Sequence, residues 1–138
     1  MTQRERPLSP HIQIYQLKYT FFSLSILHRA SGVFMSAGIV MLVYWLVAIA
    51  RGADQYAVAL RCFSAPLTQV FLFGWLAAFY YHFCNGIRHL GWDLGFGFEK
   101  AVAKKTGVLV LVVALVLTLL TWWCVSARIT AMPTGGLV

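Results

Sequence analysis

The stretch from Ala30 to Ala50, ASGVFMSAGIVMLVYWLVAIA, contains 21 residues and no charged side chain. A helix needs roughly 20 predominantly apolar residues to cross the hydrocarbon core of a bilayer, so this run has the length of one membrane span. Two further uncharged runs follow, Cys62 to Ile87 with 26 residues and Thr106 to Ala127 with 22. The sequence therefore predicts three transmembrane helices.

The composition of the 138-residue chain argues against a water-soluble domain. The chain is 60% hydrophobic and 11% charged, with a mean hydropathy of +0.75, whereas a typical soluble domain carries about 25% charged residues. Three buried helices of a soluble protein would need more polar residues to cover their outer surface. We therefore expect an all-α integral membrane protein, a three-helix transmembrane subunit.

The basic residues are distributed unevenly around the three runs. Eight lie before the first run or between the second and the third: Arg4, Arg6, Lys18, Arg29, Arg88, Lys100, Lys104 and Lys105. Three lie on the other side: Arg51, Arg61 and Arg128. Because cytoplasmic loops are enriched in Lys and Arg, we expect a cytoplasmic N-terminus and a periplasmic C-terminus. The net charge of +7 is then an orientation signal, and we expect no nucleic-acid partner.

The first eighteen residues are polar and contain Pro7 and Pro10, which disfavour a helix. We expect residues 1–18 to form a cytoplasmic arm. We expect residues 19–138 to form a membrane-anchor domain, with transmembrane helices at about 22–50, 64–89 and 106–128. No signal-peptide core and no Arg- and Ser-rich transit segment precedes the first apolar run, so we expect the inner membrane of a bacterium.

Proline and glycine mark the ends of the second helix. Pro66 suits its first turn, where the missing N–H costs no helix bond. Gly91, Gly95 and Gly97 are expected to end the regular structure.

Ionisable residues stand out against the apolar runs. His82 lies inside the second run, and Arg29 directly precedes the first. Such side chains are costly in hydrocarbon and commonly face a cofactor, a polar pocket or an ion path. His82 is six residues from Arg88, which marks the membrane boundary, and this spacing places it about 9 Å inside along a helix. His89 and Gly86 share its helix face.

The expected topology brings two groups of polar residues to one side of the membrane. The first helix begins, and the second ends, at the cytoplasmic face. The polar residues near those two helix ends should therefore lie at one depth: Ser25, His28, Arg29, His82, His89 and Asp93. We interpret them as a candidate site, although over fifty residues separate the two groups along the chain.

A neutral imidazole slightly inside the membrane, with Gly86 one turn further on, suits axial ligation of a haem between helices. The glycine would leave room for the flat macrocycle, and His28 and Arg29 would neutralise its propionates. A six-coordinate haem needs a second axial ligand. His28 and His89 are too near the surface and His11 lies in the arm, so a partner chain would supply it. The alternative for His82 is a hydrogen-bonded packing residue, and for Ser25 a bond to its own helix backbone.

Three separate motifs carry a family resemblance. They are Arg6-Pro7-Leu8-Ser9-Pro10-His11 with Ile14-Tyr15, Ser25-Ile26-Leu27-His28-Arg29 with Gly32, and His82 with Gly86-Ile87-Arg88-His89 and Trp92-Asp93. In this order they resemble the cytochrome b membrane-anchor subunit of succinate dehydrogenase, the large anchor subunit of respiratory complex II. The resemblance covers residues 6–93, and the third run matches only as a hydrophobic helix.

The resemblance implies roles for the site residues. It makes His82 the axial ligand of haem b from this chain. It places Ser25 and Arg29 at the quinone pocket, and His28 and Arg29 near the haem propionates. Ser31 stands where relatives often have Thr. Further motif residues with less defined roles near the site are Gly86, His89 and Asp93.

The resemblance also implies a complex. A flavoprotein and an iron–sulfur subunit in the cytoplasm would dock on this chain and on a second small membrane-anchor subunit. Succinate is oxidised in the flavoprotein, and electrons pass along the iron–sulfur clusters to ubiquinone at the anchor interface. This chain would then be an electron-transfer and quinone-binding subunit that is not catalytic alone.

Two other functions have to be weighed. A small multispan transporter usually keeps an acidic coupling residue inside a span, and the three uncharged runs contain no Asp or Glu. A haem-free structural anchor of a related fumarate reductase would keep the spans but lose the pairing of His82 with Gly86, which this chain retains. The sequence therefore favours the succinate dehydrogenase subunit.

Overall fold

The computed structural model describes residues 24–131, with side chains described as far as residue 127. The expected cytoplasmic arm, residues 1–18, lies outside this range. The described residues form four helices and no strand: α2 (Leu24–Ala50), α3 (Ala53–Ser64), α4 (Pro66–Asp93) and α5 (Lys100–Ala131). The all-α expectation is confirmed for this part of the chain.

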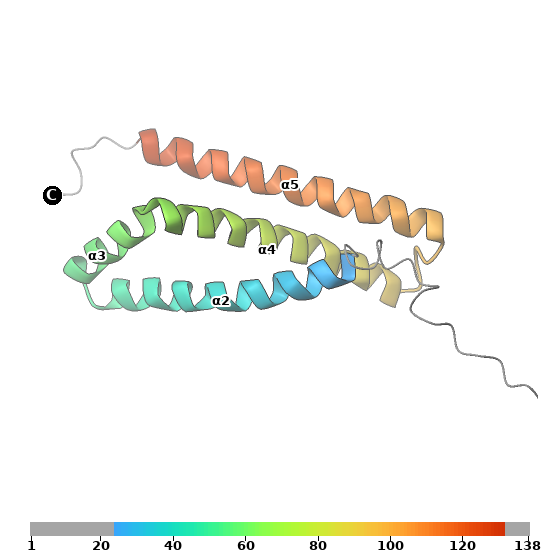
Figure 1. Ribbon diagram of the computed structural model, residues 1–138, viewed down its shortest axis with the longest axis horizontal. Coiled ribbons are helices and arrows are strands. Elements are labelled where there is room, and N and C mark those ends of the chain that lie inside the picture. Colours follow the sequence, from blue (N-terminus) through green and yellow to red (C-terminus); the bar gives the residue numbers. More distant parts are fainter. Residues whose placement is uncertain (1–23, 132–138) are drawn as a thin grey trace, which may run out of the picture.

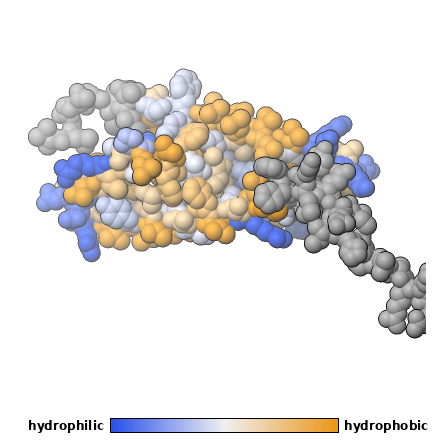
Figure 2. Space-filling model, viewed as in Figure 1, coloured by the Kyte–Doolittle hydropathy of each residue, from blue (hydrophilic) through white to orange (hydrophobic). Residues whose placement is uncertain are grey.

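Three long helices lie side by side, with α4 between α2 and α5, and the short α3 lies at one end of the bundle (Figure 1). α2, α4 and the first 28 residues of α5 are each long and apolar enough to cross a membrane. Figure 2 shows hydrophobic side chains along the middle of the bundle and hydrophilic ones gathered at its two ends. The prediction of three apolar helices of membrane-spanning length is therefore confirmed.

Proline and glycine set the limits of α4, but not in the way the sequence suggests at every position. Pro66 lies in the first turn, as predicted. The prediction that Gly91 helps to end the helix is wrong, because α4 continues through it to Asp93. A glycine within a helix costs only about 1 kcal/mol relative to alanine, so it does not stop the helix by itself. The chain turns away at Gly95 and Gly97, whose φ angles are 88° and 81° and favour glycine.

The short helix α3 is absent from the sequence prediction. Gly52, with a φ of 99°, separates it from α2, and the extended Ala65 separates it from α4. Asp54 lies in its first turn and Arg61 in its last, so both charges complement the helix dipole. The uncharged run that begins at Cys62 continues from α3 into α4, which is why hydropathy alone does not show the break.

Small residues of α2 let α4 approach closely. A methyl group at Gly38 would overlap the indole of Trp75, whose Nε1 donates a hydrogen bond to the carbonyl oxygen of Met35 at 3.1 Å. A methyl group at Gly32 would lie 3.1 Å from Cε1 of His82. These two glycines therefore allow an indole and an imidazole of α4 to pack against the backbone of α2.

Hydrogen bonds join α4 to both of its neighbours. The Tyr81 hydroxyl donates to the carbonyl oxygen of Leu24 in α2 at 2.6 Å, and the Tyr80 hydroxyl lies 2.7 Å from Oγ1 of Thr121 in α5. Within a membrane, polar groups must find their partners inside the protein. These bonds tie α4, which carries most of the predicted site, to both outer helices.

Candidate functional site

His82, on α4, is held against one turn of α2. Its Nδ1 lies 3.1 Å from the carbonyl oxygen of His28 and 3.1 Å from Oγ of Ser31. The Ser31 hydroxyl in turn donates to the same His28 carbonyl oxygen at 2.8 Å. Three polar groups thus meet at one point between the two helices.

The chemistry of these groups fixes where the hydrogens lie. A carbonyl oxygen can only accept, so the bond to His28 requires Nδ1 of His82 to carry the hydrogen. The single hydrogen of the Ser31 hydroxyl points to the same carbonyl oxygen, which leaves the serine lone pairs to accept from Nδ1. In a neutral imidazole, Nε2 of His82 is then unprotonated and available to a metal.

Two further histidines gather at this point. The ring of His28 stacks on that of His82, with centroids 3.9 Å apart and 13° between the planes. The His89 ring centroid lies 5.3 Å from that of His28. Nδ1 of His28 is buried and has no hydrogen-bond partner among the described residues. The fold therefore brings together three of the predicted site residues and leaves one buried ring nitrogen open to a further partner.

The other predicted site residues lie at the same end of the bundle but outside this cluster. Ser25 and Arg29 are exposed on α2, one helical turn apart, and Asp93 is exposed as the last residue of α4. None of the three takes part in the hydrogen bonds that hold His82. Gly86 borders open space, because a methyl group there would meet nothing within 4 Å.

Arg88 and Asn85 form a polar link that the sequence analysis did not assign. The Arg88 guanidinium donates to Oγ1 of Thr106 at 3.1 Å, to Oδ1 of the fully buried Asn85 at 3.3 Å, and to the carbonyl oxygen of Ala103 at 2.9 Å. It also lies 4.0 Å from the centroid of the Trp92 ring, a cation–π contact. The position of Arg88 at the end of an uncharged run was the available signal, since a guanidinium there needs partners within the protein.

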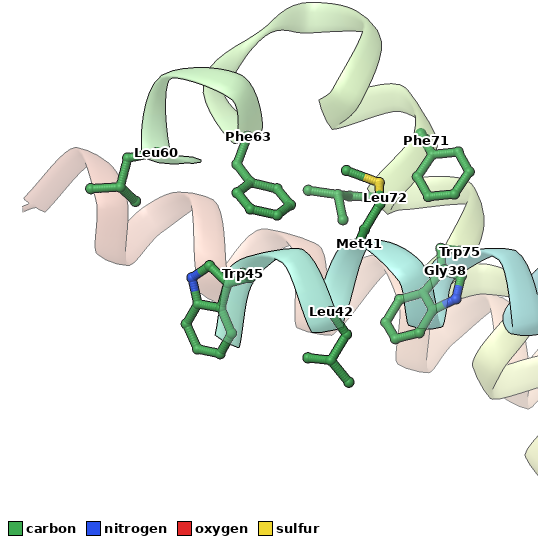
Figure 3. Close-up of a pocket in the computed structure, with 9 residues that line it drawn as sticks. All are labelled: Gly38, Met41, Leu42, Trp45, Leu60, Phe63, Phe71, Leu72 and Trp75. Atoms are coloured by element: carbon green, nitrogen blue, oxygen red, sulfur yellow. The ribbon is translucent and has the colours of Figure 1, made fainter. Parts of the chain in front are cut away.

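Three cavities lie between the helices, and His82 is not among the residues that line them. An apolar one of about 260 Å³ lies between α2, α3 and α4, where Trp45, Phe63, Phe71 and Trp75 are among its lining residues (Figure 3). Others of about 520 Å³ and 480 Å³ lie between α4 and α5 and among the three long helices. Within the described part of the chain, no group of three or more His, Cys, Asp or Glu side chains could hold a metal ion.

Together these features define a class of protein. The chain is a small helical membrane protein in which two helices hold a histidine near one end through its Nδ1, while its Nε2 bonds to no other residue of the described part. Residues 2–121 match the family model of the succinate dehydrogenase/fumarate reductase transmembrane subunit. The chain belongs to this family, and the resemblance found in its motifs is confirmed.

Named relatives agree with this assignment. The chain is 38% identical over 118 residues to the succinate dehydrogenase cytochrome b556 subunit of Rickettsia felis, a match that covers 86% of this chain and 91% of the relative. It is 37% identical over 116 residues to the cytochrome b556 subunit of Paracoccus denitrificans, with coverage of 84% and 88%. The mitochondrial cytochrome b560 subunit of Homo sapiens is 36% identical over 109 residues, which are 78% of this chain and 64% of that protein.

Proposed function

We propose that this chain is the cytochrome b membrane-anchor subunit of a succinate:ubiquinone oxidoreductase. Its family membership and the names of its relatives support this complex and a b-type haem. The chain would share the haem with a second small membrane-anchor subunit, and a flavoprotein and an iron–sulfur subunit would complete the complex. When bound, the haem supplies a centre that accepts and gives up one electron.

His82 is the residue that we assign as the axial ligand. The observation that carries this assignment is the hydrogen bond from its Nδ1 to the His28 carbonyl oxygen. Ligating histidines commonly bond their other ring nitrogen in this way, which fixes the tautomer and the ring orientation. The open space beside Gly86 fits a flat group next to α4. The unpartnered Nδ1 of His28 fits a hydrogen bond to a propionate, and Arg29 supplies a positive charge one residue further along.

The second axial ligand is assigned to the partner anchor subunit. The rings of His28 and His82 stack face to face with centroids 3.9 Å apart, so no iron fits between them. His89 lies on the same side of the bundle end, close to His28. No suitable second histidine is found between residues 24 and 127, which supports a ligand from the partner subunit.

Ser25 and Arg29 are assigned to the quinone site. Both are exposed and stand one turn apart on α2, so a hydroxyl and a guanidinium can point to one ligand. A quinone oxygen gains negative charge on reduction, and charge-assisted hydrogen bonds from these donors would stabilise it. Their exposure in the single chain fits a pocket completed by other subunits.

The charge of the helix ends supports the orientation. Five described basic residues lie where α2 begins, α4 ends and α5 begins: Arg29, Arg88, Lys100, Lys104 and Lys105. Three lie at the opposite end, Arg51 and Arg61 near α3 and Arg128 near the end of α5. By the positive-inside rule, the site end faces the cytoplasm and the C-terminus the periplasm of a bacterial inner membrane.

The alternatives receive less support. The named relatives are succinate dehydrogenase subunits, and the retained His82 and the space at Gly86 argue against a haem-free fumarate reductase anchor. α2 contains no acidic residue that could couple an ion, and Asp93 of α4 is exposed at the helix end, so a transporter is disfavoured.

A reduced-minus-oxidised optical spectrum of the purified complex tests the proposal. His82→Leu should abolish the low-spin b-type spectrum or alter it strongly, because the iron loses a ligand. The matched control is Phe83→Leu at the adjacent, exposed position, which should keep the spectrum. An unchanged spectrum in the His82 variant would contradict the assignment. Succinate–quinone turnover is not the test, since part of it can persist without this haem.

A further inference from the structure

Ser31 is the least exposed polar residue of α2, with 8% of its surface accessible. Its hydroxyl donates to the His28 carbonyl oxygen at 2.8 Å and lies 3.1 Å from Nδ1 of His82. Gly32 makes this approach possible, because a methyl group there would come within 3.1 Å of the imidazole. Ser31 and Gly32 thus form a small cradle on α2 for a side chain of α4.

A second contact distinguishes Ser31 from helical hydroxyls such as Ser36 and Thr118. A serine or threonine within a helix commonly bonds only to a carbonyl of the preceding turn. Ser36 bonds to the Gly32 carbonyl oxygen and Thr118 to the Ala114 carbonyl oxygen in this way. Ser31 makes the same kind of backbone bond and, in addition, faces a ring nitrogen on another helix. Thr106 has a similar pair of contacts, with the Ala103 carbonyl oxygen and with Arg88 of α4. What is particular to Ser31 is its partner, the imidazole that we assign as the haem ligand.

We propose that Ser31 is a positioning residue for the haem ligand, a role that rests on the proposed function of His82. It shares the Nδ1 hydrogen of His82 with the His28 carbonyl oxygen. Two acceptors around one N–H fix the plane of the imidazole and its tautomer. They also polarise the N–H bond and so raise the electron density of the ring. Nε2 then becomes a stronger electron-pair donor to iron.

This arrangement sets the direction of the expected effect. A stronger nitrogen donor stabilises the ferric form of an iron centre relative to the ferrous form. Loss of the serine hydroxyl leaves Nδ1 with one acceptor, weakens the donor and allows the ring to turn. The haem should then become easier to reduce.

Paired variants of the intact, co-expressed complex isolate the hydroxyl. The variants are Ser31→Thr and Ser31→Val, because threonine and valine side chains have nearly the same shape and only threonine retains the hydroxyl. The readouts are the haem midpoint potential in a redox titration and the low-spin ferric signal in electron paramagnetic resonance. We expect Ser31→Val to raise the ferrous-to-ferric ratio at a given potential at least threefold, which is roughly 28 mV at about 59 mV per tenfold for one electron. Ser31→Thr and the control Ser36→Ala should stay at the wild-type potential.

The outcomes separate this inference from the proposed function. If Ser31→Val keeps the wild-type potential and ferric signal while His82→Leu loses the haem, the ligand assignment stands and the role of Ser31 is wrong. If His82→Leu keeps the haem, the proposed function of His82 itself is wrong. Should Ser31→Val fail to assemble with haem, wild-type behaviour of Ser31→Thr supports the role of the hydroxyl. A Ser31→Thr complex that loses haem in the same way contradicts it.

Discussion

Gly38 offers a sharp test of how α2 and α4 pack. A methyl group at this position would overlap three atoms of the Trp75 indole. In Gly38→Ala the indole must therefore move, and its hydrogen bond to the Met35 carbonyl oxygen, 3.1 Å long, is lost or strained. The change adds a single carbon atom, so its effect reports directly on the helix contact.

The expected cost follows from three terms. Overpacking of a tight contact costs about 1–3 kcal/mol, and a lost hydrogen bond adds about 0.5–1.5 kcal/mol. Alanine is a better helix former than glycine by about 1 kcal/mol, which offsets part of this. We expect Gly38→Ala to lower the free energy of unfolding by about 1–3 kcal/mol.

Unfolding of the purified chain in mixed detergent micelles, followed by helix content during an SDS titration, measures this free energy. Gly91→Ala is the matched control, because Gly91 is also helical and a methyl group there meets nothing within 4 Å. In a Trp75→Leu background the cost of Gly38→Ala should largely disappear. If Gly38→Ala is as stable as Gly91→Ala, or keeps its full cost without the indole, the described packing is wrong.

Three further predictions concern the site end of the bundle. Arg29→Leu should depress quinone reduction far more than succinate oxidation measured with a soluble artificial acceptor, and an equal loss of both activities would indicate an assembly defect instead. Arg88→Met should lower the thermal stability of the purified complex, because it removes three hydrogen bonds between the guanidinium and its neighbours. A hydrogen bond to a charged group contributes roughly 1.5–3 kcal/mol. Unaltered stability would contradict a stabilising role for Arg88. Expressed alone, the chain should insert into the membrane but bind haem weakly or not at all, and a co-expressed second anchor subunit with its own intramembrane histidine should restore the spectrum. Stoichiometric haem with two histidine ligands in the isolated chain would refute the two-anchor arrangement.

Much of the fold could be predicted because hydrocarbon-length apolar runs leave few alternatives. The three long helices follow from runs such as Ala30 to Ala50. α3 could not be read in the same way, because its break from α4 at Ala65 falls inside an uncharged run. Gly91 was predicted to help end α4, but a glycine inside a helix lowers helix stability only slightly, and the helix continues through it.

The candidate site was predictable in its members more than in its contacts. Topology alone brought His28, His82 and His89 to one end, because the start of one helix and the end of the next share a membrane face. The cradle at Ser31 depends on which way the helices rotate about their axes, and spacing along the chain does not specify that rotation. The partners of Arg88 on α5 likewise depend on how α4 packs against α5. The third apolar run contains no motif from which this packing could be predicted.

The central claim is that His82 binds the iron through Nε2 while α2 holds Nδ1. A high-resolution structure of the intact complex with its haem tests this most directly. We expect iron bonded to Nε2 of His82 and to a histidine of another subunit, with Nδ1 of His82 still directed at the His28 carbonyl oxygen. Iron bonded to His28 or His89, or to Nδ1 of His82, would contradict it.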